Sequence, residues 1–482
     1  MTERSETSES ASAAKLRAYL IIVSVAAFAT TLAQQRMVGS LPTLFLLKEN
    51  LHVGKEKVAE FFMWATFAWN LKPLAGVLID AFPIFGSRRK AYLVLGTVGG
   101  GACWGALGLF HHDYATLLAL SVLLNAAIVF ASTAMGGLQV EASQAFAAPG
   151  RITSLRQIFS SGAMLAAPLL GGWLASQAYG WTAGVAAAAL LAAGIVAFVV
   201  LKEEPLHTLS AVSDAEFARP RYRPGLGVVL GNLALGAASL GCLANEDTRN
   251  VGFSLMALLT VFLLIVGLTV IPTRHPVIFK AQGQLTQILA SKTLWLAVVM
   301  LFLIYMVPGL YTALTFKQSD ELHFSKELIG TLTGWEAAMG LGAAFIYGTT
   351  CKRFTLQTLL VTTVLANALL TLTYLYYRAD TAIYIHSVGG FVGIGSELAL
   401  MDLAVRSTPK GCEALGFALM MSIRNFGISM SDVIGTKMID VYHFQFNQLV
   451  IINAATTALV LLFVPLLPRA IMLVREGEVA PR

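Results

Sequence analysis

Long apolar runs separated by short polar turns occupy most of the chain. About 20 consecutive apolar residues are needed for a helix to cross the hydrocarbon core of a bilayer. Twelve runs meet this length, six in the first 201 residues and six from residue 293 onward. The predicted spans are 17–47, 57–80, 91–110, 115–144, 153–178, 181–201, 293–316, 326–350, 355–377, 381–405, 413–437 and 446–468. The pattern predicts an all-α polytopic membrane protein.

Two further apolar runs, 225–243 and 250–272, lie between the two sets of six. The second run, FSLMALLTVFLLIVGLTVI, is strongly apolar, whereas the first is rich in glycine. We expect the pair to form an inserted transmembrane hairpin, which gives 14 spans in total. The alternative is a first segment that is re-entrant or lies on the membrane surface.

The predicted organisation therefore has five parts. They are a polar, disordered cytoplasmic tail (1–15), an N-terminal six-helix bundle (16–201), a cytoplasmic linker that carries the hairpin (202–292), a C-terminal six-helix bundle (293–468) and a second cytoplasmic tail (469–482). Two six-helix bundles joined by a basic linker suggest the major facilitator fold, which holds its substrate between the bundles near the middle of the membrane.

The composition excludes several classes of protein. Hydrophobic residues make up 56% of the chain, and charged residues are only 12%, about half of the usual quarter, which excludes a soluble enzyme. No GxxxxGK[ST] motif is present, so a pump with its own nucleotide-binding domain is excluded as well. The four cysteines show no metal-ligand spacing. We expect no catalytic residue, no metal site and no cofactor.

The basic residues indicate the orientation of the chain. The net charge is +6, and most of the 33 lysines and arginines fall in the loops on the side that would hold both termini. The positive-inside rule makes that side cytoplasmic. Because the basic residues are scattered, nucleic-acid binding is not expected. We expect a monomeric, multi-pass protein of a plasma or inner membrane whose partners are the lipid bilayer and a small-molecule substrate.

Two motifs resemble the signatures of the folate–biopterin transporter family. The first is WNLKPLAGVLIDAFPIFGSRRKAYL from Trp69, and the second is TPKGCEALGFALMMSIRNFG from Thr408. A third stretch, LTFKQSDELHFSKELIGTLTGW, is similar to the segment that leads into the eighth core helix of the family. The resemblance implies a major facilitator fold and transport of folates, pterins or S-adenosylmethionine. Arg424 departs from the pattern, because the family usually has an uncharged residue there.

The loop after the second predicted span is a candidate gate. Asp80 precedes the basic residues Arg88 and Arg89, and a carboxylate at the end of one helix can hold such arginines in one closed state. The alternative is that the arginines only follow the positive-inside rule. The resemblance adds Glu141 as a second acidic partner, since the family usually carries an acid in that region.

Polar residues inside the N-terminal spans are candidate substrate contacts. Gln34, Gln35 and Arg36 follow one another within the first run, where polar groups that faced lipid would be costly. The alternative is a span that ends at Ala33 and leaves these residues at the outer interface. Lys72 lies within the second run and needs an acidic partner or an anionic ligand. Its alternative is snorkelling to the cytoplasmic face.

The C-terminal half offers a second set of candidates. Trp335 can stack on a flat heterocycle, although packing is its alternative role, and Glu336 follows it deep in the predicted span. Glu397 and Arg424 lie near mid-membrane on consecutive predicted helices and are expected to meet, either as a working pair or as a static one. Asn425 belongs to the same expected substrate-binding set. Glu336 and Glu397 are the candidates for carrying a coupled proton.

These features predict a secondary active transporter, a symporter that moves a folate or pterin-like substrate by alternating access and is coupled to protons. A pterin presents a pair of donors that suits a carboxylate, and a folate adds an anionic tail that suits arginine or lysine. Three alternatives stay open: a transporter of S-adenosylmethionine or a nucleoside with the same fold, a 14-span drug exporter, and a membrane receptor that does not transport. Buried charges disfavour the receptor.

Overall fold

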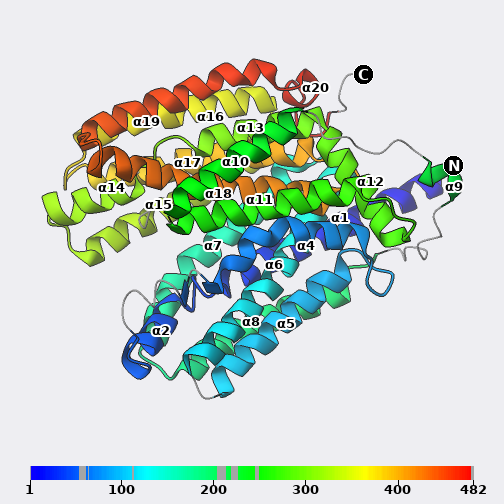
Figure 1. Ribbon diagram of the computed structural model, residues 1–482, viewed down its shortest axis with the longest axis horizontal. Coiled ribbons are helices and arrows are strands. Elements are labelled where there is room, and N and C mark those ends of the chain that lie inside the picture. Colours follow the sequence, from blue (N-terminus) through cyan, green and yellow to red (C-terminus); the bar gives the residue numbers. More distant parts are fainter. Residues whose placement is uncertain are drawn as a thin grey trace. The chain divides into compact units, whose positions relative to one another are not determined.

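The computed structural model describes residues 2–53, 61–62, 64–110, 113–203, 213–218, 226–244 and 249–478, and it is helical throughout this part of the chain (Figure 1). An isolated bridge between Ile84 and Ser87 closes the turn before α5, and no strand occurs among these residues. The all-α architecture predicted from the apolar runs is confirmed.

The N-terminal half contains four helices that match single predicted spans. The helices of this half are α1 (Thr2–Leu32), α2 (Ser40–Phe45), η1 (Leu46–Asn50), η2 (Phe67–Leu71), α4 (Lys72–Ala81), α5 (Lys90–Leu109), α6 (Tyr114–Ala145), α7 (Pro149–Ala175) and α8 (Tyr179–Val200). Helices α5 to α8 correspond to the runs predicted at 91–110, 115–144, 153–178 and 181–201. Helices α5 and α8 pack closely, with Gly194 against Thr97 and Gly101 against Leu191.

The first predicted span is not continuous, which corrects the helix expected over 17–47. Helix α1 ends at Leu32, a turn follows, and α2 begins only at Ser40. The Trp104 indole donates a hydrogen bond to the Ala33 carbonyl (2.9 Å), which satisfies one of the carbonyls freed by the break. Gly39 lies against the Trp104 ring, where a Cβ atom would come within 2.7 Å. Tertiary packing of one buried tryptophan therefore stabilises the break.

The second predicted span, 57–80, is also divided. Part of it (residues 57–60 and 63) lies outside the described residues. Residues 61–62 and 64–65 are helical, and a turn at Thr66 leads into the 3₁₀ helix η2 and then α4. Pro73 lies in the first turn of α4, where a missing N–H costs nothing because first-turn donors have no intrahelical partner. The proline therefore favours a new helix start over continuation of the previous one.

The N-terminal tail differs from the expectation as well. The structure extends α1 back to Thr2, so residues 2–15, which the sequence predicts to be disordered, are helical. This stretch contains alanine, glutamate, lysine and arginine and has neither glycine nor proline. Nothing in it therefore stops a helix from continuing outward from the apolar run.

Within its described residues, the central region contains two more helices than expected, α9 (Asp214–Phe217) and α12 (Pro276–Ala290). The apolar runs form α10 (Leu226–Ala244) and α11 (Arg249–Val270), which pack on each other, and the short α9 precedes them. Helix α12 was missed, because its 15 residues are too short and too polar for a span. Gln282 of α12 donates hydrogen bonds to the Leu268 and Ile271 carbonyls at the end of α11. Helix α12 is thus joined to the α10–α11 pair.

The C-terminal half repeats the pattern of spans with one break. Its helices are α13 (Lys292–Tyr305), α14 (Tyr311–Phe316), η4 (Lys317–Glu321), α15 (Lys326–Thr350), α16 (Leu356–Thr371), η5 (Leu372–Tyr376), α17 (Ala382–Ser407), α18 (Glu413–Asp440), α19 (Phe446–Val460), η6 (Leu461–Leu466) and α20 (Arg469–Met472). The helix expected over 293–316 is interrupted between Tyr305 and Tyr311, which corrects that span. Gly309 lies in the interruption and donates its N–H to the Ser431 carbonyl of α18 (2.7 Å).

The chain divides into two compact units. Unit 1 comprises Met1–Glu141, Ala166–Ser291 and Pro409–Ser422, and unit 2 comprises Ala142–Leu165, Lys292–Thr408 and Ile423–Arg482. Unit 1 therefore includes the start of α18, and unit 2 includes the first part of α7. The predicted bundles, 16–201 and 293–468, would instead put all of α7 in the N-terminal bundle and all of the predicted span 413–437 in the C-terminal one.

The structure supports a multi-pass membrane protein. Within the described residues, eight helices are long and apolar enough to cross a membrane, or nine if α12 and α13, which meet at 64°, count as one bent span. The segment Val229–Ala244 of α10 is apolar but too short to count as a span. The total of 14 spans and the membrane crossing of the α10–α11 pair stay predictions.

The position of the α10–α11 turn provides a test of the topology. In a background without the native cysteines, Arg249→Cys should react with a membrane-impermeant maleimide from the outside, because residue 249 is exposed at the start of α11 and the predicted hairpin enters from the cytoplasm. Lys352→Cys, in the exposed turn after α15, should react only from the cytoplasm and is the matched control. Arg221, predicted to be cytoplasmic, lies outside the described residues. Labelling of residue 249 from the cytoplasmic side alone would rule out the hairpin.

Candidate functional site

Asp80 is the centre of a buried ion cluster in unit 1. Its Oδ1 atom lies 2.5 Å from Arg89 Nη1 and 3.4 Å from Arg88 Nη2, and its Oδ2 atom accepts the backbone N–H of Leu415 at 2.8 Å. Asp80 is fully buried, and Arg89 is 1% exposed. A carboxylate buried this deeply needs a cation and hydrogen-bond donors around it, and here it has both.

Two more carboxylates complete the Asp80 cluster. Arg89 Nη2 lies 2.9 Å from Glu141 Oε1 on α6 and 3.1 Å from Glu413 Oε2 at the start of α18. Burial lowers the pKa of the Arg89 guanidinium, but the charges of Asp80 and Glu141 outweigh it, and the pKa is raised above its usual value. The four residues predicted for the gate are brought together. Glu413 was not assigned to it, although it lies within the second motif.

The arginine loop is held in place by a residue far away in sequence. The Glu203 carboxylate accepts the backbone N–H groups of Arg88 (3.0 Å), Arg89 (3.0 Å) and Lys90 (2.9 Å), at the start of α5. An anion is stabilised there by the orphan donors and the positive end of the helix dipole. Gly86, with φ of +74°, makes the preceding turn. No motif contains Glu203, so its role could not be predicted from the sequence.

Helix α12 reaches the same cluster. Gln284 donates hydrogen bonds to the backbone carbonyls of Asp80 (3.1 Å) and Gly411 (2.9 Å). The Cys412 thiol lies next to it and is buried, and burial, aided by the charges of Asp80 and Glu413, raises the pKa of the Cys412 thiol to about 12. The end of α4 and the loop before α18 are thus tied to a helix that the sequence did not reveal.

The polar residues of the first run have mostly internal partners. Gln35 is buried and donates to Ser121 Oγ on α6 at 2.7 Å, while Gln34 donates to the Thr30 carbonyl at 3.1 Å. Arg36 is exposed, with its guanidinium 5.7 Å from the centre of the Phe62 ring. Arg36 is the charged residue of the three and is exposed, and contact of any of them with substrate stays a prediction.

Lys72 is buried at the start of α4. Its Nζ atom lies 3.1 Å from Ser132 Oγ on α6 and 5.3 Å from the centre of the Trp69 ring. The Trp69 indole in turn donates to Asn125 Oδ1 at 3.0 Å. Because Lys72 is only 4% exposed, its side chain does not snorkel to water in this state.

A second charge cluster lies in unit 2, where the expected meeting of Glu397 and Arg424 is observed. Arg424 Nη2 lies 2.5 Å from Glu397 Oε1, and Arg424 Nε donates to the Tyr305 hydroxyl at 3.2 Å. Arg424 Nη1 also donates to Asn425 Oδ1 at 3.2 Å. Arg156 of α7 interacts electrostatically with both Glu397 and Arg424. This arrangement joins four helices, α7, α13, α17 and α18, through charged and phenolic groups.

Glu336 has a partner that was not predicted from the sequence. Its Oε2 atom lies 3.0 Å from His386 Nδ1 on α17, and the other ring nitrogen of His386 lies 2.9 Å from the Tyr377 hydroxyl. Trp335, beside Glu336, is 46% exposed. A histidine inside the apolar run 381–405 was the available signal, since a polar ring in such a run needs partners.

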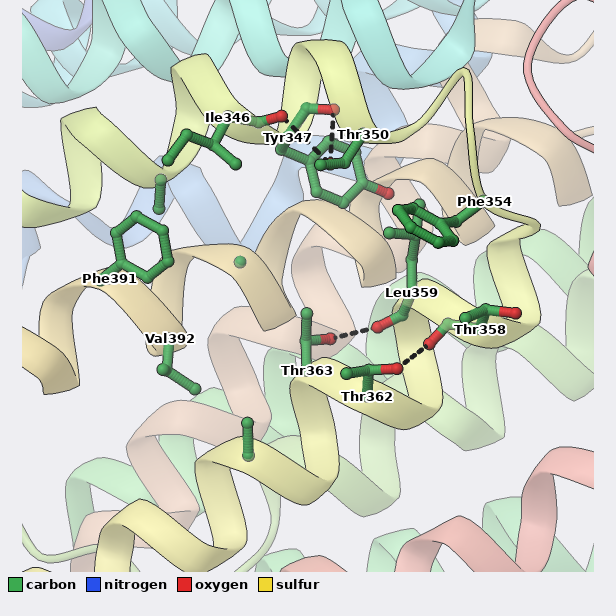
Figure 2. A pocket seen from close by; sticks show the side chains of 13 residues that line it. Ile346, Tyr347, Thr350, Phe354, Thr358, Leu359, Thr362, Thr363, Phe391 and Val392 are labelled. Carbon is green, nitrogen blue, oxygen red and sulfur yellow. Dashed lines mark hydrogen bonds between the residues drawn. The ribbon is translucent and has the colours of Figure 1, made fainter.

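A cavity between α15, α16 and α17 is not the predicted substrate site. It encloses about 340 Å³, and its walls carry apolar side chains such as Ile346, Phe354 and Phe391 (Figure 2). The hydroxyls of Thr362 and Thr363 are bonded to carbonyls of their own helix, which Figure 2 shows as dashed lines. None of the predicted site residues lines this cavity.

Comparison with known proteins decides the family. The sequence profile of the BT1 family matches residues 35–479. The chain belongs to the BT1 family. A folate-biopterin transporter of Synechocystis sp. is 26% identical over 453 residues, which cover 89% of this chain and 78% of that protein. Folate transporter 1 of Plasmodium falciparum is 33% identical over 85 residues, 17% of each chain.

Solved structures show the fold of this BT1 family protein. The proton:xylose symporter XylE, a major facilitator superfamily protein, aligns with a TM-score of 0.58 over 95% of this chain and 96% of its own, at 12% identity. The human organic anion transporter MFSD10 aligns with a TM-score of 0.61 over 94% and 99%, also at 12% identity. The predicted resemblance to the folate–biopterin transporter family and the major facilitator fold are confirmed, and the protein belongs to a family of transporters.

The Asp80 cluster predicts a strong effect of one substitution. Asp80→Asn keeps an oxygen for the Leu415 N–H but removes the charge that holds Arg88 and Arg89, and breaking a buried ion pair costs about 3–5 kcal/mol. Transport in proteoliposomes should fall about 10-fold or more while the protein remains in the membrane. Asp113→Asn, in an exposed turn, is the control. Normal transport by Asp80→Asn would show that the cluster does not act in the transport cycle.

Cys412 offers an independent measurement of the same cluster. Its burial and its thiol pKa of about 12 predict slow reaction with N-ethylmaleimide near pH 7.5, since the thiolate is the reactive form. In a protein whose only cysteine is Cys412, Asp80→Asn should increase the rate of alkylation about 10-fold or more, because the loop before α18 loses an anchor. Equal rates with and without Asp80→Asn would contradict an anchoring role for Asp80.

Proposed function

We propose that the protein is a secondary active transporter that moves a folate or pterin-like substrate by alternating access and uses a proton as the coupling ion. The observation that carries the proposal is the Glu397–Arg424 pair, which places both a hydrogen-bond acceptor and a cation inside the apolar helices of unit 2. Membership of the BT1 family supports transport, and the names of the relatives support the substrate class.

Each member of the pair suits one end of a folate, and because the two are 2.5 Å apart the pair binds one end at a time. A guanidinium binds a carboxylate through charge-assisted hydrogen bonds, so Arg424 is suited to the glutamate tail. A carboxylate accepts the paired donors of a pterin ring, so Glu397 is suited to the other end. Both side chains are 20% exposed, which leaves room for a ligand to reach them. Tyr305, whose ring centre lies 5.1 Å from the Arg424 guanidinium carbon, adds an aromatic surface for stacking.

The Asp80 cluster supplies the gate in this proposal. It joins α4, α6, the start of α5 and the first turn of α18 through ion pairs that centre on the buried Arg89. Such pairs are stable only while all partners remain together, so the cluster favours one closed state. Opening must separate charges, and hydration of the exposed groups then compensates for the lost pairs.

The proposed topology follows the sequence prediction. Twelve core spans and the α10–α11 hairpin give 14, with both termini in the cytoplasm. The breaks after α1 and α13 interrupt two of the core spans, and packing against Trp104 and α18 stabilises them. Backbone breaks at membrane depth are tolerated where the protein satisfies the freed polar groups.

A substrate panel tests the function directly. Purified protein in proteoliposomes should accumulate a labelled folate or a labelled pterin when the outside is more acidic than the lumen, and a protonophore should abolish the accumulation. The same vesicles should be tested with S-adenosylmethionine and with a cationic amphipathic drug. Uptake of either of these, with no uptake of folates and pterins, would replace the proposed substrate class.

Loss of the proposed contact between Arg424 and the substrate carboxylate should affect folate more than pterin. Arg424→Ala should reduce uptake of folate about 100-fold, because an unpaired substrate carboxylate would be left in a dry site, and it should reduce uptake of an uncharged pterin much less. Arg378→Ala, which removes an arginine from the exposed loop before α17, is the control. Equal losses for folate and pterin would indicate that Arg424 has a structural role.

A further inference from the structure

We propose that His386 and Glu336 together form the binding site of the coupling proton, and that Gln318 in η4 transmits its occupancy to the rest of unit 2. This inference rests on the proposed transport function. It selects one of the two carboxylates that the sequence offers for the proton, and it adds the histidine that completes the site.

The site is a chain of hydrogen bonds with one exposed end. The Glu336 carboxylate on α15 is 46% exposed, and it lies 3.0 Å from Nδ1 of the His386 ring, which is 6% exposed. Nε2 of the same ring lies 2.9 Å from the Tyr377 hydroxyl and 3.2 Å from Gln318 Nε2. Gln318 also donates to the Tyr377 hydroxyl at 2.5 Å. These hydrogen bonds therefore connect a partly exposed carboxylate to a buried imidazole.

The His386–Glu336 pair is surrounded mainly by tyrosines, a neutral amide and apolar side chains. The titratable groups that face the ring are Glu336 from α15, Tyr374 from η5 and Tyr377 directly after η5. From η4 the ring meets the neutral amide of Gln318, whereas Lys317 of that element pairs with Glu321 at 3.2 Å. Phe324 and Ile385 belong to the apolar cluster that includes Tyr377. Gain of a proton here changes the local charge by a full unit.

Both protonation states of His386 can be satisfied, but with different partners. The neutral ring donates from Nδ1 to Glu336 and accepts at Nε2 from the Tyr377 hydroxyl or the Gln318 amide. The protonated ring donates from both nitrogens, so Nε2 then needs an acceptor. The Tyr377 oxygen can accept, but the Gln318 NH₂ group would face another donor. Proton binding therefore requires the Gln318 side chain to turn or move away.

Gln318 lies in the segment that connects the broken helix to α15, so a movement of its side chain would affect that connection. It belongs to the π-helical turn η4, which follows α14 and the break after α13, and its carbonyl accepts the N–H of Phe324 at 2.8 Å. π-helical turns are energetically unfavourable and often occur at functional sites. His323, between η4 and α15, adopts φ of +52°. The connection between the broken helix and α15 is thus in direct contact with the proposed proton site.

Glu397 is the less suitable carboxylate for this role. Its partner, Arg424, carries a permanent charge, so a proton on Glu397 would leave a largely buried guanidinium without its counterion. Glu336 is paired instead with a histidine, the side chain whose charge changes most readily between about pH 5 and 8. A carboxylate–imidazole pair can therefore gain and release a proton without leaving a fixed charge unpaired.

Transport by two variants tests the proposal. His386→Gln and Glu336→Gln retain hydrogen-bonding groups but remove the titratable ones. Each should exchange substrate in counterflow within about 2-fold of the unmodified protein, while accumulation driven by a pH gradient should fall about 10-fold or more. His443→Gln, in the exposed loop after α18, should keep gradient-driven accumulation and is the matched control. If His386→Gln or Glu336→Gln keeps it as well, or loses counterflow to the same extent, the proton assignment is overturned.

A measurement without substrate separates this inference from the proposed function. Trp335 adjoins Glu336, so its fluorescence, taken as the difference between the unmodified protein and Trp335→Phe, should change with pH between about 5 and 8. The change should be absent in His386→Gln and present in His443→Gln. A protein that carries neither folates nor pterins but shows this titration would refute only the substrate class. A pH response that persists in His386→Gln would refute the proton site.

Discussion

A charge that is buried among apolar helices must have a partner, and the polar architecture of this protein follows from that constraint. Asp80 is completely buried, and its carboxylate is neutralised by Arg89 and by backbone donors from the start of α18. Because these groups come from positions more than 300 residues apart, the pairing fixes a long-range contact within unit 1. Unpaired, each of these ions would cost several kcal/mol. The same constraint joins Glu397 to Arg424 and Glu336 to His386 in unit 2.

The three clusters differ in the kind of partner, and that difference separates their proposed roles. In the Asp80 cluster the guanidinium of Arg89 is permanently charged, and both Asp80 and Arg89 are almost fully buried, which suits a contact that is either closed or broken. Glu397 and Arg424 are partly exposed, so a ligand can compete for either of them. Glu336 is paired with a group that can itself gain or lose a proton. The proposed roles in gating, substrate binding and proton coupling therefore belong to three pairs with different kinds of partner.

The breaks in the helices show where local patterns fail to predict structure. The apolar runs 17–47 and 293–316 read as continuous spans, yet both are divided in the structure. In the first, the Trp104 indole bonds to the Ala33 carbonyl, and in the second, Gly309 bonds to the Ser431 carbonyl of α18. Hydrophobicity within a run cannot reveal these contacts, because the partner lies in another helix. Helix α12 was missed for a related reason: its amphipathic pattern is too short to suggest a span, and its partners are distant.

The sequence by itself determined the all-helical membrane class and the family, and it picked out Asp80, Arg88, Arg89 and Glu141 as a candidate cluster, because apolar length and local motifs are properties of neighbouring residues. Tertiary structure alone decided that Glu413 joins this cluster and that Glu203 caps the helix that follows Arg89. It also decided that His386 is the partner of Glu336. Each of these pairings connects residues on different helices. Their distance depends on how the helices pack, which no local pattern encodes.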